Sequence, residues 1–298
     1  MDKMTLVRLS TADTARLKNS ARIAQQLEDL WAAKIERTLM DQIPETITSL
    51  ERTGKPFCKD LTELFVEHFF QVSIQAMKFA MTESEPDAKI PKGKGKKLAT
   101  KYPKVEIPRA LADLMRLYDL WKRKRFIPKQ QFKQAKEIKK AYLDKCKSVW
   151  EKHAEEFRSG GISSQENVTK KIREAARTTT SRAKTIVRTE TTNYYNTARK
   201  QFYDMSPDIT HYLFIAVRDA GTSPWCTPLT IDGKRGRSGL VYAKSDPLCE
   251  KEKPACHPNC RSEYLPLNNL NPTHLKFIND PKIQRRAHTC FPLLRGWK

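Results

Sequence analysis

Long apolar runs are missing from this sequence. The longest uncharged stretch of apolar character, residues 68–77, has ten residues and contains two Gln, whereas a membrane-spanning helix needs about 20 apolar residues. The first 20 residues carry charges where a secretory signal peptide would have an unbroken apolar segment. We therefore expect no membrane association, with synthesis and folding in a cytoplasm.

Two common enzyme motifs and a disulfide framework are also missing. The sequence has neither a Gly-rich phosphate loop of the Walker type nor a Gly-x-Ser-x-Gly nucleophile elbow. Cysteine is sparse and uneven, because Cys58 and Cys146 stand alone while four of the 7 lie between Cys226 and Cys260. This distribution does not suit a disulfide scaffold, and the crowding of four thiols suggests metal chemistry.

Acidic residues are few relative to basic ones. Asp and Glu number 34 against 56 Lys and Arg, for a formal charge of +22, which indicates an anionic partner such as nucleic acid or an anionic membrane surface. The basic charge is concentrated, because residues 89–150 hold 20 Lys or Arg against 5 Asp or Glu, a net +15. The hydrophobic share of 39% still permits a buried core.

Helical periodicity dominates the first two thirds of the chain. Apolar residues recur every three or four positions over residues 15–43, which predicts one helix. A second helix is expected to begin after Asp60, a suitable N-cap, and to close before Pro86. The apolar stripes of these helices should pack together. Two more helices are predicted between residues 108 and 157, separated at Pro128.

A long helix over residues 163–205 is expected to lead into a different architecture. Asp232-Gly233 offers a hairpin turn. Strands are predicted by β-branched and aromatic enrichment at residues 211–217, 240–242 and 261–267. The predicted fold class is α+β, with a mainly helical N-terminal region, then a long helix and a small antiparallel β-sheet in a Cys/His-rich C-terminal domain.

Composition divides the chain into four segments. These are a helical N-terminal region (1–88), a basic linker with helices (89–160), a C-terminal domain (161–268) and a tail (269–298). The tail alternates apolar and basic residues and is interrupted by three prolines, which oppose one continuous helix. It either folds back on its own domain or anchors the chain to another protein.

Basic side chains alternate with aromatic ones in the second segment. Such a face neutralises phosphates without reading sequence, which predicts non-specific binding to double-stranded DNA. A solvated helix face or an exposed loop is the alternative. The candidate residues are Lys94, Lys96, Lys97, Lys122, Arg123, Lys124, Arg125, Lys129, Lys133 and Lys136.

Five possible zinc ligands crowd within 35 residues of the C-terminal domain. Thiolate and imidazole hold zinc tetrahedrally, and four of the five would close a structural site. His257 and Cys260 have the two-residue spacing of a knuckle, whereas the neighbours Cys256 and His257 are not expected to bind the same ion. Free buried thiols, or a pair of Cys249 with Cys256, are the alternatives. The candidate ligands are Cys226, Cys249, Cys256, His257 and Cys260.

Four blocks of residues in the C-terminal domain form a recognisable pattern. They are Arg188-Thr189-Glu190 with Asn193 and Ala198-Arg199, then Asp219 with Thr222-Ser223-Pro224 and Cys226, then Asp232-Gly233, and finally His257-Pro258-Asn259-Cys260-Arg261. Their order and spacing resemble the Mu F-like head morphogenesis family, the minor head proteins of tailed bacteriophages. The likeness covers about residues 170–268, and Gly221 and Ser262 stand where the family often has Arg and Cys.

The resemblance implies a structural protein of the virion, present in few copies inside the capsid near the portal and, during assembly, in the host cytoplasm. Its implied partners are the portal, other capsid proteins and packaged DNA, in head assembly, DNA packaging or DNA delivery. An alternative is a metal-dependent nuclease in which Asp219, His257 and Asn259 would bind a catalytic ion. Structural roles in the motif are expected for Arg188, Glu190, Asp219, Thr222 and Arg261. Because Arg188 and Glu190 are two apart on a helix, each needs its own partner.

Overall fold

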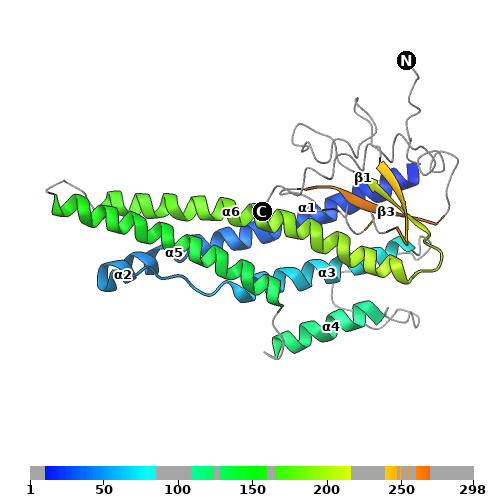
Figure 1. Cartoon of the computed structure of the whole chain (residues 1–298), viewed down its shortest axis with the longest axis horizontal. Helices are drawn as coiled ribbons and strands as arrows, with labels where there is room; N and C mark the ends of the chain where they lie inside the picture. Colours follow the sequence, from blue (N-terminus) through cyan, green and yellow to red (C-terminus); the bar gives the residue numbers. More distant parts are fainter. Residues whose placement is uncertain are drawn as a thin grey trace, which may run out of the picture.

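Six helices and three strands make up the part of the chain that the computed structural model describes. The described residues are 11–84, 109–123, 128–159, 165–215, 239–246 and 260–268, together with Cys249 and Pro254. The helices extend along the long axis of the molecule, and the sheet lies at one end of them (Figure 1). Their bounds are α1 Thr11–Met40, α2 Ile43–Thr53, α3 Thr62–Ser84, α4 Arg109–Lys122, α5 Lys129–Arg158, α6 Gln165–Met205, β1 His211–Ile215, β2 Gly239–Ala243 and β3 Glu263–Leu267.

The 41-residue helix α6 is the centre of the helical part. At about 1.5 Å per residue it is about 60 Å long, and α1, α3 and α5 all pack on it. The two apolar stripes predicted for α1 and α3 do meet in one buried core, but each helix contacts α6 more than it contacts the other. The core residues of α6 recur at helical spacing, as in Ile172, Ala176, Ala183 and Val187.

The first helix ends earlier than its periodicity predicts. The stripe predicted one helix over residues 15–43, yet α1 ends at Met40 and a separate helix α2 follows. Pro44 stands in the first turn of α2, where a missing amide N–H costs nothing. Gly54 ends α2 in the left-handed conformation at φ 68°, and its N–H bonds the Leu50 carbonyl. Helix α2 was not predicted.

The other helix boundaries follow local signals in the sequence. Asp60 lies just before α3, and its Oδ1 accepts the Thr62 hydroxyl at 2.7 Å and the Thr62 N–H at 2.9 Å. These bonds lower the pKa of Asp60, with help from Lys139 and Lys136. The predicted break between α4 and α5 is confirmed, because Pro128 directly precedes α5.

The three strands form one antiparallel sheet in the order β2-β1-β3. The central strand β1 pairs His211 with Ala243 on one side and with Leu267 on the other. One face of the sheet packs its aromatic residues with Tyr203 of α6. The opposite face packs its aliphatic residues with Leu17 of α1. Each face of the sheet therefore contacts at least one helix, and the combination of helices with an antiparallel sheet confirms the α+β class. The predicted turn at Asp232-Gly233 lies outside the described residues.

No helix among the described residues is long and apolar enough to cross a membrane.

Candidate functional site

A buried polar cluster joins three helices to the sheet. At its centre lies Arg199, whose side chain is only 2% exposed. Two tyrosines of the same helix, one serine and two carboxylates surround it. The members, called the Arg199 cluster below, are Arg199, Tyr195 and Tyr203 of α6, Ser20 of α1, Glu83 of α3 and Glu263 of β3.

Every nitrogen of the Arg199 guanidinium has a partner in this cluster. Nη2 lies 2.8 Å from Glu83 Oε2, and Nη1 lies 3.2 Å from Glu263 Oε2. Nη1 also donates to Ser20 Oγ at 2.8 Å, and Nε donates to the Tyr203 hydroxyl at 3.3 Å. The Ser20 hydroxyl donates to Glu263, and the Tyr203 hydroxyl donates to Glu83. One cation thus links α1, α3, α6 and β3.

The charged side chains of the Arg199 cluster shift one another's pKa values. Burial raises the pKa of Glu263, and the nearby Arg199 cation opposes that rise. Burial disfavours the Arg199 cation, but Tyr203, Glu83, Tyr195 and Glu263 outweigh it and raise the pKa of Arg199 well above its ordinary value. Arg16 Nε adds a second cation 3.6 Å from Glu83 Oε1. Arg199 therefore remains charged, and removing it would leave buried carboxylates without their main partner.

Polar side chains of α6 also hold the segment that leads into β3. The Thr192 hydroxyl donates to the Cys260 carbonyl at 2.8 Å. Asn196 Nδ2 donates to the Ser262 carbonyl at 3.2 Å, and Asn196 Oδ1 accepts the Tyr264 N–H at 3.1 Å. Asn196 thereby satisfies backbone groups on both sides of β3's first residue, as a neighbouring strand would. The residues after the His-Pro-Asn-Cys-Arg block are fixed to the long helix in this way.

The described residues of the Mu F-like motif do not form one site, because their side chains contact different parts of the protein. Arg188 Nε lies 2.8 Å from Glu28 Oε1 of α1. Glu190 accepts from Gln134 of α5 at 2.8 Å and from Asn193 at 3.2 Å. The two side chains thus contact different helices, and both contacts hold helices together. Arg261 is exposed, and Asp219 and Thr222 lie outside the described residues.

Two of the five candidate zinc ligands lie in described positions. Cys249 and Cys260 are both buried in the hydrophobic cluster between the sheet and α6, together with Tyr212 and Tyr264. The Cys249 carbonyl accepts the Tyr264 hydroxyl. Among the described residues no three His, Cys, Asp or Glu side chains gather as a metal site would require. The other candidates, Cys226, Cys256 and His257, lie outside the described regions.

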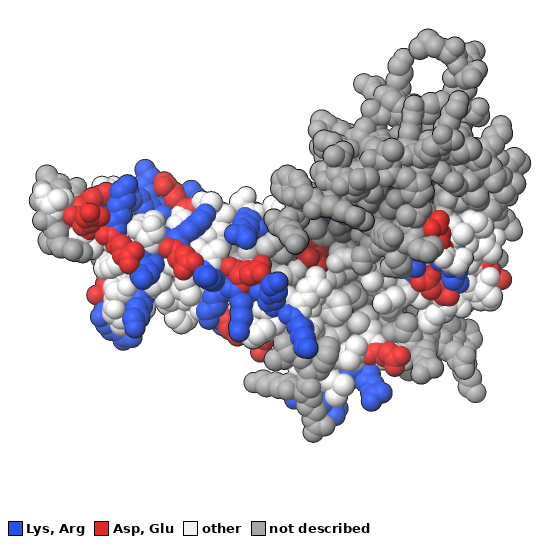
Figure 2. All heavy atoms as spheres, viewed as in Figure 1, with Lys and Arg blue, Asp and Glu red and all other residues white. Residues whose placement is uncertain are grey.

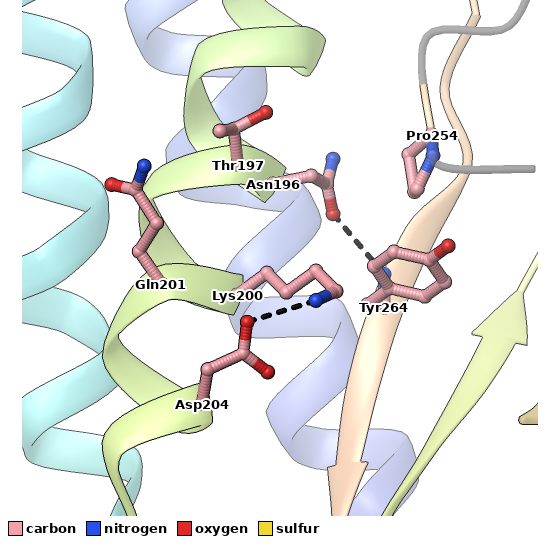
Figure 3. Close-up of a pocket in the computed structure, with 7 residues that line it drawn as sticks. All are labelled: Asn196, Thr197, Lys200, Gln201, Asp204, Pro254 and Tyr264. Atoms are coloured by element: carbon pink, nitrogen blue, oxygen red, sulfur yellow. Dashed lines mark hydrogen bonds and ion pairs between the residues drawn. The ribbon is translucent and has the colours of Figure 1, made fainter. Parts of the chain in front are cut away.

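A small hollow of about 110 Å³ lies between the C-terminal part of α6 and β3 (Figure 3). Lys200 Nζ lies 2.8 Å from Asp204 Oδ2 of the same helix, and Asn196 Oδ1 accepts the backbone N–H of Tyr264. The side chains of Asn196, Lys200 and Asp204 thus bind other groups of the protein. The volume of the hollow is also below that of pockets for drug-sized ligands. The lining residues are Asn196, Thr197, Lys200, Gln201, Asp204, Pro254 and Tyr264.

Basic side chains cover much of the helical part, mixed with acidic ones (Figure 2). Lys122 Nζ lies 4.7 Å from the Trp121 ring and 5.2 Å from the Tyr118 ring. Lys136 Nζ lies 4.2 Å from the Phe132 ring. Each of the five described candidates for DNA contact is exposed, namely Lys122, Arg123, Lys129, Lys133 and Lys136. The remaining candidates, Lys94, Lys96, Lys97, Lys124 and Arg125, are not described.

Sequence reasoning missed most of the Arg199 cluster. Arg199 appeared only as part of a motif, and no role was assigned to Ser20, Glu83 or Glu263. One local signal exists, because Arg199 stands between Tyr195 and Tyr203 at four-residue spacing, on the buried side of α6. Its partners are 179, 116 and 64 residues away in the chain. Periodicity carries no information about pairs so far apart.

Residues 157–265 match the family model described as Phage Mu protein F like protein. The matched region begins near the end of α5, contains all of α6, β1 and β2, and ends within β3. It contains the α6 and β3 members of the Arg199 cluster and the α6–β3 contacts, whereas Ser20 and Glu83 of the cluster precede it. No curated protein and no solved structure matches the chain.

Proposed function

We propose that this chain, which carries a Phage Mu protein F-like domain over residues 157–265, is a minor head protein of a tailed bacteriophage that acts in head morphogenesis. The observation that carries the proposal is the family match itself. The contacts inside the protein agree with a structural role. The polar groups of Arg199, Asn196 and Glu190 form hydrogen bonds or ion pairs that join one helix or strand to another. The chain would belong to the capsid interior near the portal, and to the host cytoplasm during assembly.

The portal and other capsid proteins are the protein partners that we propose. The tail, residues 269–298, lies outside the described residues, and its apolar end from Phe291 to Trp297 is the proposed anchor. Aromatic and aliphatic side chains at a chain end fill pockets of a partner well. Packaged double-stranded DNA is the proposed second partner, bound through basic side chains without sequence preference.

Zinc is the cofactor that we propose for the cysteine-rich segment. Four of Cys226, Cys249, Cys256, His257 and Cys260 would hold it, and bound zinc would cross-link loops that have little core of their own. The burial of Cys249 and Cys260 in one cluster supports this assignment, because a structural site is closed to water. The site would keep no open coordination position, so its role would be folding rather than hydrolysis.

Co-expression with the portal protein of the same phage tests the proposed function. Portal captured through an affinity tag should retain the full chain, whereas a chain truncated after Asn271 should remain folded and elute unbound. A full-length variant with Phe291→Ala, Leu293→Ala and Trp297→Ala separates loss of the anchor from loss of length. Failure of the full chain to co-elute would refute the portal as a partner. Equal retention of the truncated chain would move the anchor to the helical N-terminal region.

A further inference from the structure

Four lysines form a row along the exposed side of α5. The row, called the lysine row below, consists of Lys129, Lys133, Lys136 and Lys140. Successive members are four, three and four residues apart, which places them on one side of an α-helix. All four side chains are exposed. At about 1.5 Å of rise per residue the row extends over about 16 Å. Figure 2 shows Lys and Arg side chains gathered on this part of the helical surface.

Among the residues that the structure describes, the row forms no ion pair, in contrast to several basic side chains of α5 and α6. On α6, Lys184 Nζ lies 2.6 Å from Glu36 and Arg188 lies 2.8 Å from Glu28. Farther along α5, Lys147 lies 3.4 Å from Glu151. Within the described part of the chain, no carboxylate lies within 4.0 Å of a lysine nitrogen of the row. Residues 129–140 contain five Lys and a single acid, Glu137. The described carboxylates therefore leave the row without a direct ion pair, although Lys136 acts on Asp60 over a longer distance.

The opposite side of α5 fixes the direction in which the row faces. Gln131 Nε2 donates to the Tyr194 hydroxyl at 2.8 Å, and Gln134 Nε2 donates to Glu190 at 2.8 Å. Ile138 and Tyr142 are buried in the core. Because these contacts bind α5 to α6, the lysines project outward from a rigid support. Such preorganisation lowers the entropic cost of binding a ligand with regularly spaced charges.

We propose that the lysine row is the principal contact of this protein with duplex DNA, and that it binds the phosphates of the backbone without reading bases. The choice of DNA as the biological ligand rests on the proposed function. Helical neighbours three or four residues apart lie about 5 to 6 Å from one another, which suits successive phosphate contacts. Lysine supplies point charges and lacks the fork with which arginine reads guanine. The row precedes residues 157–265, so it belongs to this chain rather than to the matched domain.

An acidic protein surface is the competing occupant, and the surroundings of the row disfavour it. Protein interfaces have an apolar or aromatic centre inside a polar rim. Among the described residues, the large hydrophobic side chains that are exposed lie on other segments, none of them on α5. They are Leu30, Phe57, Met115, Leu117 and Met205.

Salt-dependent binding of the full chain to a short mixed-sequence duplex tests the row. The row variant replaces Lys129, Lys133, Lys136 and Lys140 with Gln. The matched control removes four exposed lysines elsewhere, with Lys55→Gln, Lys78→Gln, Lys145→Gln and Lys152→Gln. Fluorescence anisotropy should give a slope of log affinity against log salt that is shallower by about 3 to 4 in the row variant, and by less than about 1 in the control. Affinity at about 0.1 M salt should fall at least tenfold in the row variant alone.

Two results would overturn the proposal. Equal losses in both variants would mean that diffuse charge, and not the row, binds DNA. Unchanged DNA binding together with lost portal co-elution in the row variant would assign the row to an acidic protein. Thermal unfolding of both variants checks that the fold is intact. The DNA measurement uses the isolated chain, so a negative DNA result would not contradict the proposed role as a head protein. Absence of the chain from phage heads would likewise not contradict a positive DNA result.

Discussion

Arg199 and His68 show two ways in which this core accommodates a titratable group. Arg199 stays charged, because two carboxylates and two hydroxyls surround it. His68 of α3 is instead buried as a neutral ring, 2.8 Å from the Thr191 hydroxyl of α6 and beside the rings of Trp31 and Tyr194. Both groups connect α3 to α6, but they respond differently to substitution and to pH.

Replacing Arg199 should destabilise the protein strongly. Arg199→Met keeps much of the side-chain volume and leaves Glu83 and Glu263 buried without the cation that they share, which should cost about 3 to 5 kcal/mol. The matched control is Arg188→Met on the same helix, whose ion pair with Glu28 involves a half-exposed arginine and should be worth about 1 kcal/mol or less. Urea unfolding measures both. Similar losses in the two variants would contradict a special role for the Arg199 cluster.

The burial of His68 should make folding stability fall in mild acid. Burial lowers the pKa of His68 to about 3, while the unfolded chain titrates near the ordinary pKa of about 6.5. Below pH 6.5 the unfolded state therefore binds a proton that the folded state refuses, until the pH approaches 3. Between pH 7.5 and 5.5 this should cost about 1.4 kcal/mol. His68→Gln, measured by urea unfolding at both pH values, should lose that much less. Parallel pH dependences in the two proteins would refute this account.

At the scale of elements, the sequence predicts the helices and strands that local patterns specify, but it does not predict contacts between residues far apart in the chain. The helices α3, α4, α5 and α6 and all three strands follow from periodicity, from Pro128 and from aromatic enrichment. Helix α2 was missed although Pro44 and Gly54 mark its ends, because the α1 stripe runs almost to its start. The Arg199 cluster depends on partners from four elements. Its members therefore become neighbours only after the chain has folded.

Zinc in the cysteine-rich segment would stabilise the sheet and the loops around it. Structural zinc supplies roughly 10 to 16 kcal/mol of apparent folding free energy in small peptides, so its loss should melt this module first. Elemental analysis of protein purified without chelator should give about one zinc per chain. Cys260→Ser should lower both the zinc content and the unfolding temperature, whereas Cys146→Ser in the helical core should leave the zinc content unchanged. Protein free of zinc, with unaltered unfolding in Cys260→Ser, would end this proposal.

At the scale of the whole molecule, the first three segments distinguished by composition contribute described residues to one buried core. Residues of α1, α3, α5 and α6 belong to the same hydrophobic cluster. Leu17, near the start of the described residues, packs on the sheet, whose strands lie more than 190 residues later in the chain. The Mu F-like domain is therefore covered by helices that precede the matched region, and the N-terminal helices and the sheet should lose structure together when the Arg199 cluster is broken.

The protein composition of phage heads tests the central claim most directly. Quantitative mass spectrometry of purified procapsids and DNA-filled heads, from the phage that encodes this chain, should detect it in a few copies per particle in at least one of the two. Portal protein in the same samples provides the internal standard for copy number. Absence of the chain from both procapsids and filled heads, with portal present in normal amount, would contradict a role as a minor head protein.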